Sequence, residues 1–348
     1  MTTVTPFSEA RAYTPLESIE HRGAQMAAAF ASAPEEYSAA HGTCVCFDRT
    51  DRGLLTISGD ERKPWLHSLV TNSVTTLDDN AGVYAFAVNV KGRILFDVNI
   101  LCLHNALWLD LDLLAVDTAI EHFDRHLFTE NVRIGDTTTH MARIACCGSQ
   151  AAWIAGQLGV TDLPAAAALV SFALPQGDAR LMRNDFAGIP GFDVFVPRAE
   201  GPAWWDRLVG LGARPAGCRT LDLLRIEAGI PWLGPDLNEG VLPSETGQLE
   251  RGVSHQKGCY LGQEIVERMR SRGTVARRLV RLRVADGEGL DLPATLQQNT
   301  ASVGTMTSLA RHPLRSQWVG LGYLRSGVTD LADITVGDPP RDVTIGAD

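Results

Sequence analysis

The sequence predicts an α+β protein that ends in a small all-β module. Strand-like runs at 83–90, 93–103 and 105–111 are joined by short turns, which indicates antiparallel neighbours. Helical patterns stand between groups of strands instead of following every strand, as is typical of α+β folds. Beyond residue 276, short strands alternate with turn signals, which favours a small β-barrel.

Two further regions lack this strand pattern. Residues 1–40 are mixed in character, and we expect an N-terminal extension on the surface, with a short helix at 21–30 and a second one after Pro34. Residues 229–247 follow a predicted helix at 220–228 and show no clear period. A loop of that length in a compact protein is more often functional than idle.

Composition excludes several kinds of partner and site. The formal net charge of −10 argues against nucleic-acid binding, which needs a basic surface. No apolar run reaches the roughly 18 residues that a membrane span requires, and no secretory signal is visible, so we expect a cytoplasmic protein without a membrane partner. The seven cysteines have irregular spacings, which favours neither a disulfide framework nor a metal site.

The most informative stretch covers residues 251–273. Gly258 and Gly262 flank Cys259, so the backbone there can adopt positive φ or approach another segment closely. A helix is predicted to begin directly after this loop. Cys259 therefore precedes a helix N-terminus and has Lys257 nearby, which together favour a reactive thiolate. The alternative is a half-buried cysteine that only packs the loop.

Charged residues inside apolar segments are the other candidates. Asp97 interrupts a strand-like run, and a carboxylate there is costly unless it is hydrogen-bonded. It is either a ligand-binding group or a solvent-facing strand residue, and Asp193 raises the same question in the run 192–196. Arg225 and Glu227 lie two residues apart on a predicted helix, so they point to different sides of it.

Several segments also carry a family resemblance. Lys257-Gly-Cys-Tyr followed by Gly262-Gln-Glu resembles the K-G-C-Y-x-G-Q-E signature of the YgfZ family, a folate-binding branch of the glycine-cleavage T-protein (GcvT) superfamily. Segments 59–72, 84–97 and 221–247 are similar to superfamily patterns, and so is Gly322-Tyr-Leu-Arg. True aminomethyltransferases lack the cysteine signature, and Phe96 replaces an acidic residue often seen beside the T-protein aspartate, so the resemblance favours the YgfZ branch.

The resemblance implies a ring of mixed α+β subdomains around a channel that holds tetrahydrofolate. The expected bounds are 41–275 for a folate-binding region of two interleaved subdomains, 276–330 for a C-terminal β-barrel and 331–348 for a tail. By motif match, the expected catalytic residues are Cys259 and Asp97. The expected cofactor-binding residues are Asp97, Asp193, Arg225, Glu227, Lys257, Tyr260 and Gln263.

Two functions follow from the resemblance. The first is a tetrahydrofolate-binding accessory protein that supports iron–sulfur cluster assembly or repair, with Cys259 as a thiol or transient ligand and iron–sulfur client or assembly proteins as partners. The alternative is a folate-dependent aminomethyl or methyl transferase, or a demethylase, in which Asp97 polarises a folate nitrogen. A third interpretation is a folate-channel fold that has lost its ligand.

Overall fold

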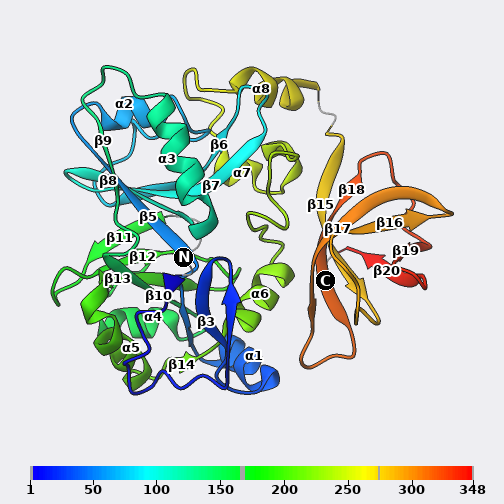
Figure 1. Ribbon diagram of the computed structural model, residues 1–348, viewed down its shortest axis with the longest axis horizontal. Coiled ribbons are helices and arrows are strands. Elements are labelled where there is room, and N and C mark those ends of the chain that lie inside the picture. Colours follow the sequence, from blue (N-terminus) through cyan, green and yellow to red (C-terminus); the bar gives the residue numbers. More distant parts are fainter. Residues whose placement is uncertain (1–2, 165–168, 273–274, 347–348) are drawn as a thin grey trace.

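The computed structural model describes residues 3–164, 169–272 and 275–346, without the side chains of residues 270–272. Within these ranges the chain forms an eleven-stranded sheet, a three-stranded sheet and a closed barrel of six strands. Figure 1 shows the large sheet with its helices on one side of the molecule and the barrel on the other. The prediction of an α+β fold with a C-terminal β-barrel is confirmed.

The eleven-stranded sheet consists of two antiparallel halves. One half contains β6, β7, β8, β5 and β9 in that order, and the other contains β11, β12, β13, β10 and β4, with the short β14 parallel to β4 at the edge. The halves join where β11 pairs with β6 through two residue pairs. The strands are β4 Val45–Asp48, β5 Arg52–Ser58, β6 Ala81–Val88, β7 Ile94–Cys102, β8 Ala106–Asp112, β9 Arg133–Asp136, β10 Met141–Cys147, β11 Leu169–Ala173, β12 Arg180–Arg183, β13 Gly191–Pro197 and β14 Arg214–Pro215.

Along β6 and β7, side chains alternate between the two faces of the first half, and one of these faces packs against helices. Phe96 and Val98 belong to a core that α2 (Arg62–His67) and α3 (Val116–Arg125) cover. Asp97 stands between Phe96 and Val98 in β7, and its side chain therefore lies on the opposite face of the sheet. Its partner in register is Phe86 of β6. The side that Asp97 takes is thus set by its neighbours in the strand.

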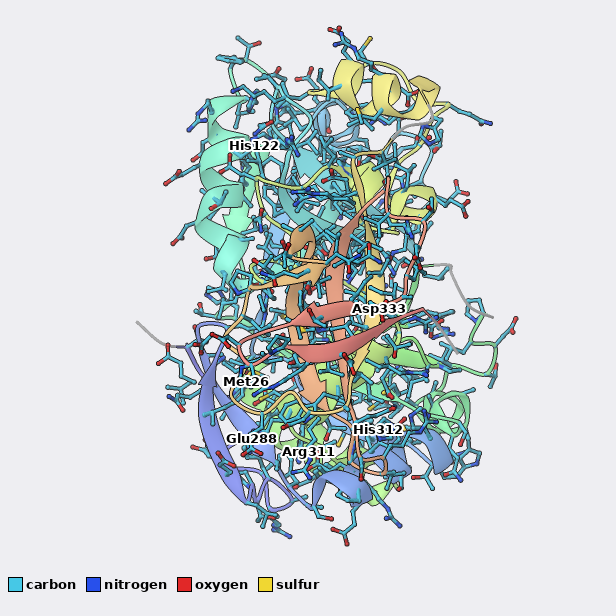
Figure 2. All side chains as sticks on the ribbon, turned by 90° about the vertical axis from the view of Figure 1, so that its right-hand side faces the viewer. Met26, His122, Glu288, Arg311, His312 and Asp333 are labelled. Atoms are coloured by element: carbon cyan, nitrogen blue, oxygen red, sulfur yellow. The ribbon has the colours of Figure 1, made fainter. Side chains whose placement is uncertain are left out.

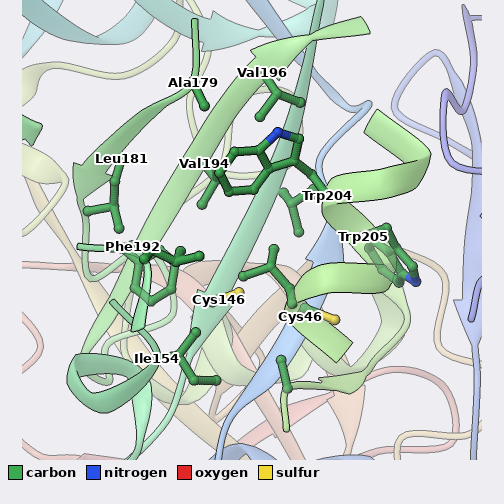
Figure 3. Close-up of a cluster of buried hydrophobic side chains, with 14 of the residues drawn as sticks. Cys46, Cys146, Ile154, Ala179, Leu181, Phe192, Val194, Val196, Trp204 and Trp205 are labelled. Carbon is green, nitrogen blue, oxygen red and sulfur yellow. The ribbon is translucent and has the colours of Figure 1, made fainter. Parts of the chain in front are cut away.

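The second half packs its apolar face against two helices. Figure 3 shows Trp204 and Trp205 of α5 (Gly201–Gly210) and Ile154 of α4 (Ala151–Gln157) around the strand residues Phe192 and Cys146. Trp205 is fully buried, and the described residues of this cluster are almost all apolar. The Ala-rich segment after β10 begins with α4, and β11 follows later in the chain.

The N-terminal segment differs from its prediction. The run expected as a helix at 21–30 forms the hairpin of β2 (Glu17–His21) and β3 (Ala24–Ala29), to which β1 (Thr3–Val4) adds in parallel. Its turn uses positive φ at Arg22 and Gly23, which ends any helix there. Phe7 and Tyr13 pack on the ring of Trp205, so this segment is part of the core rather than a surface extension. The helix predicted after Pro34 is present as α1 (Ala33–Gly42).

The barrel includes residues that were expected to form a tail. Strand β20 pairs with β15, which closes the barrel, and β19 pairs with β16. The reason lies in Ile334, Val336 and Val343, whose buried side chains contribute to the barrel core. The strands are β15 Arg277–Val284, β16 Ala294–Gln298, β17 Ala301–Arg311, β18 Trp318–Arg325, β19 Ile334–Val336 and β20 Arg341–Ile345.

Helix α6 (Cys218–Glu227) packs against the barrel. Leu223 and Ile226 of α6 pack against Val319 and Leu321 of β18. None of the helices in the described part of the chain is long and apolar enough to cross a bilayer. The remaining elements are α6 Cys218–Glu227, α7 Leu249–Gly252, α8 Gln263–Arg272 and the 3₁₀ turns η1 Leu113–Ala115, η2 Arg198–Glu200 and η3 Pro243–Glu245.

Candidate functional site

A cavity lies over the face of β6 and β7 that carries Tyr84 and Asp97, where the two halves of the sheet meet the segment after α6. Both halves contribute to its wall, since Asp97 belongs to β7 and Arg143 to β10. The open space measures about 50 Å³. The lining residues are Arg49, Arg52, Tyr84, Asp97, Asn99, Arg143, Asn184, Phe186, Ile230, Pro231, Trp232, Gln248 and Arg251.

Asp97 is the carboxylate in this wall. It is partly buried, and the phenol of Tyr84 donates a hydrogen bond to its Oδ2 over 3.1 Å. Burial raises the pKa of Asp97, and the nearby charge of Arg52 only partly opposes that effect. The carboxylate therefore has capacity to accept further hydrogen bonds and holds a proton more readily than an exposed aspartate.

Three arginines form the floor of the cavity, and each is already paired with a carboxylate. Arg49 bonds Asp51 over 2.8 Å, and Arg52 bonds Asp110 over 3.0 Å. Arg143 also contacts Asp110. These ion pairs fix the guanidinium groups in place, because a buried charge that lost its partner would be strongly unfavourable.

Two lining residues have polar atoms without a protein partner. Asn99 is 7% exposed, and its Nδ2 donates to Asp110 while its Oδ1 has no hydrogen-bond partner among the described residues. Arg143 is equally buried, and its Nε is likewise unpartnered. Buried polar atoms are rarely left unpaired in native proteins, so these two favour a polar ligand or water in the cavity.

Arg251 stands apart from the other arginines of the wall. It is exposed, and its guanidinium lies 4.0 Å from the centre of the Tyr84 ring. It forms no ion pair with any carboxylate in the part of the chain that the structure describes. Its charge is therefore available to an anionic group at the mouth of the cavity.

Asp193 lies behind the cavity wall and does not line it. It is fully buried in β13, where Arg143 donates to it over 2.7 Å and Asn184 over 2.8 Å. Both of these partners line the cavity. Asp193 thus acts on the cavity only by holding Arg143 and Asn184.

Arg225 and Glu227 lie on the barrel side of α6 rather than in the cavity. The Arg225 guanidinium contacts Asp236 and donates to Ser308 of β17 over 2.8 Å. It also stacks on the ring of Trp232, which does line the cavity. Glu227 faces a separate cleft. Neither residue lines the cavity.

The cysteine loop forms a second candidate region, next to the hairpin that carries Asp97. Cys259 is exposed, in contrast to the other six cysteines, all of which are buried. Lys257 is buried, and its ammonium donates to the carbonyl oxygens of His67, Val70 and Asn72. Desolvation lowers the pKa of Lys257 to about 7. Since three carbonyls hold the ammonium, its visible role is to anchor the loop.

The glycine before α8 allows close docking of this loop. Gly262 has φ +79°, and a Cβ at this position would lie 2.5 Å from the carbonyl oxygen of Asn89. Gly258 has open space instead. Tyr260 is buried beneath the loop, and the Lys257 ammonium lies 4.9 Å from the centre of its ring. The loop is therefore a fixed platform that presents Cys259 to solvent, while Gln263 begins α8.

A family comparison decides to which group the chain belongs. The model described as the GCVT N-terminal domain matches residues 1–257 of the 348. The chain belongs to the GCVT N-terminal domain family.

Relatives called aminomethyltransferase match this chain over most of their length. The aminomethyltransferase of Rubrobacter xylanophilus is 28% identical over 330 residues, which cover 92% of this chain and 86% of the relative. That of Bacillus pumilus is 24% identical, with coverages of 95% and 92%. The crystal structure of glycine cleavage system aminomethyltransferase T from Bartonella henselae matches with a TM-score of 0.88 at 19% identity and covers 100% of this chain and 97% of that one. The predicted GcvT-like fold is thus confirmed through the barrel.

Several residues of the cavity had not been singled out in the sequence. Tyr84 and Trp232 lie inside the segments 84–97 and 221–247, which resemble superfamily patterns, and Arg251 begins the stretch 251–273. Trp232 also lies in the aperiodic loop after α6. Arg52 and Arg143 gave no signal, because their pairing partners are distant in sequence.

Proposed function

We propose that the cavity binds tetrahydrofolate and that the protein transfers a one-carbon group of the aminomethyl type to or from it. The observation that carries this proposal is Asp97, a partly buried carboxylate with a raised pKa and a single hydrogen bond, in the wall of a cavity. The names of the relatives support the reaction class, since they are called aminomethyltransferase and match most of both chains.

The residues of the cavity fit the chemistry of a reduced folate. Its flat pterin offers N–H donors, for which Asp97 and the free Oδ1 of Asn99 are acceptors. Rings of Tyr84 and Trp232 supply flat apolar surface. The exposed guanidinium of Arg251 suits the carboxylates of the glutamate tail. When bound, tetrahydrofolate supplies nitrogens that carry the one-carbon unit.

The size of the cavity requires one side chain to move. An open space of about 50 Å³ holds only a few waters, far below the roughly 300 Å³ or more of typical ligand pockets. Arg251 is exposed and covers the Tyr84 ring, so its departure would uncover an aromatic face. In this proposal Arg251 exchanges the Tyr84 ring for the ligand carboxylate. Asp97 then orients a folate nitrogen and holds or releases a proton there.

Anaerobic calorimetric titration with tetrahydrofolate tests the binding part. We expect saturable binding that Asp97→Asn weakens by at least about tenfold, which corresponds to one charge-assisted hydrogen bond. Asp117→Asn is the control, because Asp117 is an exposed aspartate on α3 outside the cavity. Absence of binding by the wild-type protein, or equal affinity in both variants, would contradict the proposal. Turnover with a methylamine-type donor then tests the transfer.

The accessory function remains a second candidate, and one observation favours it. Cys259 is exposed on a loop that Lys257 and Gly262 fix in place, within the segment that resembles the YgfZ signature. In this proposal the folate cavity is retained, and Cys259 serves iron–sulfur client or assembly proteins as a thiol or transient ligand.

The two candidates respond differently to loss of the thiol. If the wild-type protein transfers a one-carbon group and Cys259→Ala transfers it equally well, the transferase is the main function. If no transfer occurs but iron–sulfur enzyme activity in cells lacking the protein returns with the wild type and not with Cys259→Ala, the accessory function is supported.

A further inference from the structure

A second cleft separates α1 and the end of α6 from the barrel. Its open space is about 270 Å³, and it shares no lining residue with the cavity around Asp97. Figure 2 shows His312, next to the cleft, in the lower part of the view. The lining residues are Tyr37, His41, Ile226, Glu227, Arg281, Leu282, Arg283, Arg315, Gln317, Val319, Gly320 and Gly346.

Two arginines of this cleft lack a carboxylate partner. Arg281 of β15 donates to the backbone oxygen of Glu227 over 3.0 Å, which leaves its charge uncompensated. Arg315 lies in the exposed turn between β17 and β18. Neither forms an ion pair within the described ranges. Most buried or half-buried arginines elsewhere in the molecule are paired, so this concentration of unpaired charge is local to the cleft.

Two neutral N–H donors at the same cleft also lack partners. His312 is 3% exposed, and its Nδ1 accepts from the amide of Leu314, which places the proton of the neutral ring on Nε2. That Nε2 has no hydrogen-bond partner in the described structure, and the same holds for the buried Nε2 of Gln317. Unpartnered donors that are this deeply buried call for an acceptor.

Glu227 supplies the only carboxylate among the lining residues, and it does not satisfy these donors. It accepts a hydrogen bond from the phenol of Tyr37 over 3.3 Å. It lies 3.3 Å from Nε2 of His312, but without the alignment of a hydrogen bond. The single carboxylate of Glu227 is thus the only negative charge among the lining residues. The guanidinium groups of Arg281 and Arg315 and two N–H groups without hydrogen-bond partners in the described ranges lie around it. The cleft has an excess of donors and of positive charge.

We propose that this cleft binds a small anionic ligand that carries a phosphate or carboxylate group. Arg281 and Arg315 compensate the charge of the ligand, and Gln317 and His312 donate to its oxygen atoms. An anion is favoured over a neutral ligand because two guanidinium groups converge where the chain provides too few acceptors. The site lies between α6 and the barrel, so its ligand contacts both parts of the molecule.

Calorimetric titration of the full chain with inorganic phosphate and, separately, with succinate tests this site. We expect one of the two anions to bind, and Arg281→Gln and Arg315→Gln each to weaken that binding by about tenfold or more. Arg278→Gln is the matched control, since Arg278 is an exposed arginine of β15 outside the cleft. Binding of phosphate alone assigns a phosphate ester, and tighter binding of succinate assigns a carboxylate.

Two outcomes would overturn the proposal. The first is that neither anion binds the wild-type protein. The second is that Arg278→Gln weakens binding as much as Arg315→Gln does, which would indicate diffuse attraction to surface charge. Arg315 is exposed, so its substitution leaves folding intact, and far-ultraviolet circular dichroism verifies this. Tetrahydrofolate binding should be unchanged in Arg315→Gln, which keeps this test separate from that of the Asp97 cavity.

Discussion

Two carboxylates, the partly buried Asp97 and the fully buried Asp236, have very different hydrogen-bonding environments. Asp236 is fully buried and accepts from the amide of Trp232 and from the hydroxyls of Thr307 and Ser308. It also contacts the guanidinium of Arg225. Asp97 has one hydrogen bond, from a tyrosine, and faces a cavity.

The number of hydrogen bonds that each carboxylate accepts indicates which of the two is available to a ligand. Asp236 is saturated by donors from the loop, from α6 and from β17, so it joins the large sheet to the barrel. Asp97 can accept further hydrogen bonds. Its burial disfavours the charged form of the carboxylate, and the protein groups around it only partly compensate for that effect. Unused capacity, rather than burial of charge, marks the candidate site.

The largest expected change in stability is at Asp236, whose carboxylate accepts several hydrogen bonds within the protein. Asp236→Ala should lower the free energy of unfolding by about 3–5 kcal/mol, because it leaves the buried charge of Arg225 without its partner. Urea unfolding followed by circular dichroism measures this. Arg225→Met combined with Asp236→Ala should recover part of the loss, since it removes the orphaned charge. A loss below about 1 kcal/mol for Asp236→Ala would show that the contact is not a structural junction.

The docking of the cysteine loop should give an intermediate effect. Gly262→Ala places a Cβ against the carbonyl of Asn89 at a positive φ, so we expect a loss of about 2 kcal/mol in the free energy of unfolding. Gly258→Ala is the matched control in the same loop and should cost far less, because no atom lies within 4 Å of its Cβ position. Equal losses in the two variants would contradict the close approach at Gly262.

A smaller effect of opposite sign is expected at Asp97, and it depends on pH. The folded-state pKa of Asp97 lies above its ordinary value of 3.8, so folding favours the protonated form. Its favourable contribution is complete below pH 3.8 and is lost as the pH rises through the raised value. Asp97→Asn should therefore be more stable than the wild type at pH 7, with the difference shrinking toward pH 4. Urea unfolding at both pH values measures this, and a variant less stable at pH 7 would contradict it.

The smallest effect is expected at Cys259. Its side chain is exposed, so Cys259→Ser should change the free energy of unfolding by less than about 0.5 kcal/mol. The reaction of the wild-type thiol with a coloured disulfide reagent under native conditions should proceed with one equivalent, because the other six cysteines are buried. More than one equivalent in the folded protein would show that another thiol is accessible.

The sequence allowed the fold class to be predicted because strand alternation and short turns are local signals. It could not settle the sides of Asp97 and Asp193. Both are strand carboxylates, but Asp97 is partly buried beside Tyr84, whereas Asp193 is fully buried and paired with Arg143. Their roles depend on which arginine approaches from another strand, and Arg143 reaches Asp193 across a pairing that the sequence does not reveal. The prediction that residues 331–348 form a tail was wrong, because the strands β19 and β20 within them are short and polar on one side.

The seam between β11 and β6 has a mechanical consequence. Among the described residues, two pairs join β11 to β6 there, whereas β6 and β7 share seven. The ion pair of Arg143 with Asp110 also connects the two halves. A ligand in contact with both Asp97 and Arg143 would span the two halves and act as a clasp across them. A bound ligand would then reduce the motion of the two halves of the sheet relative to each other.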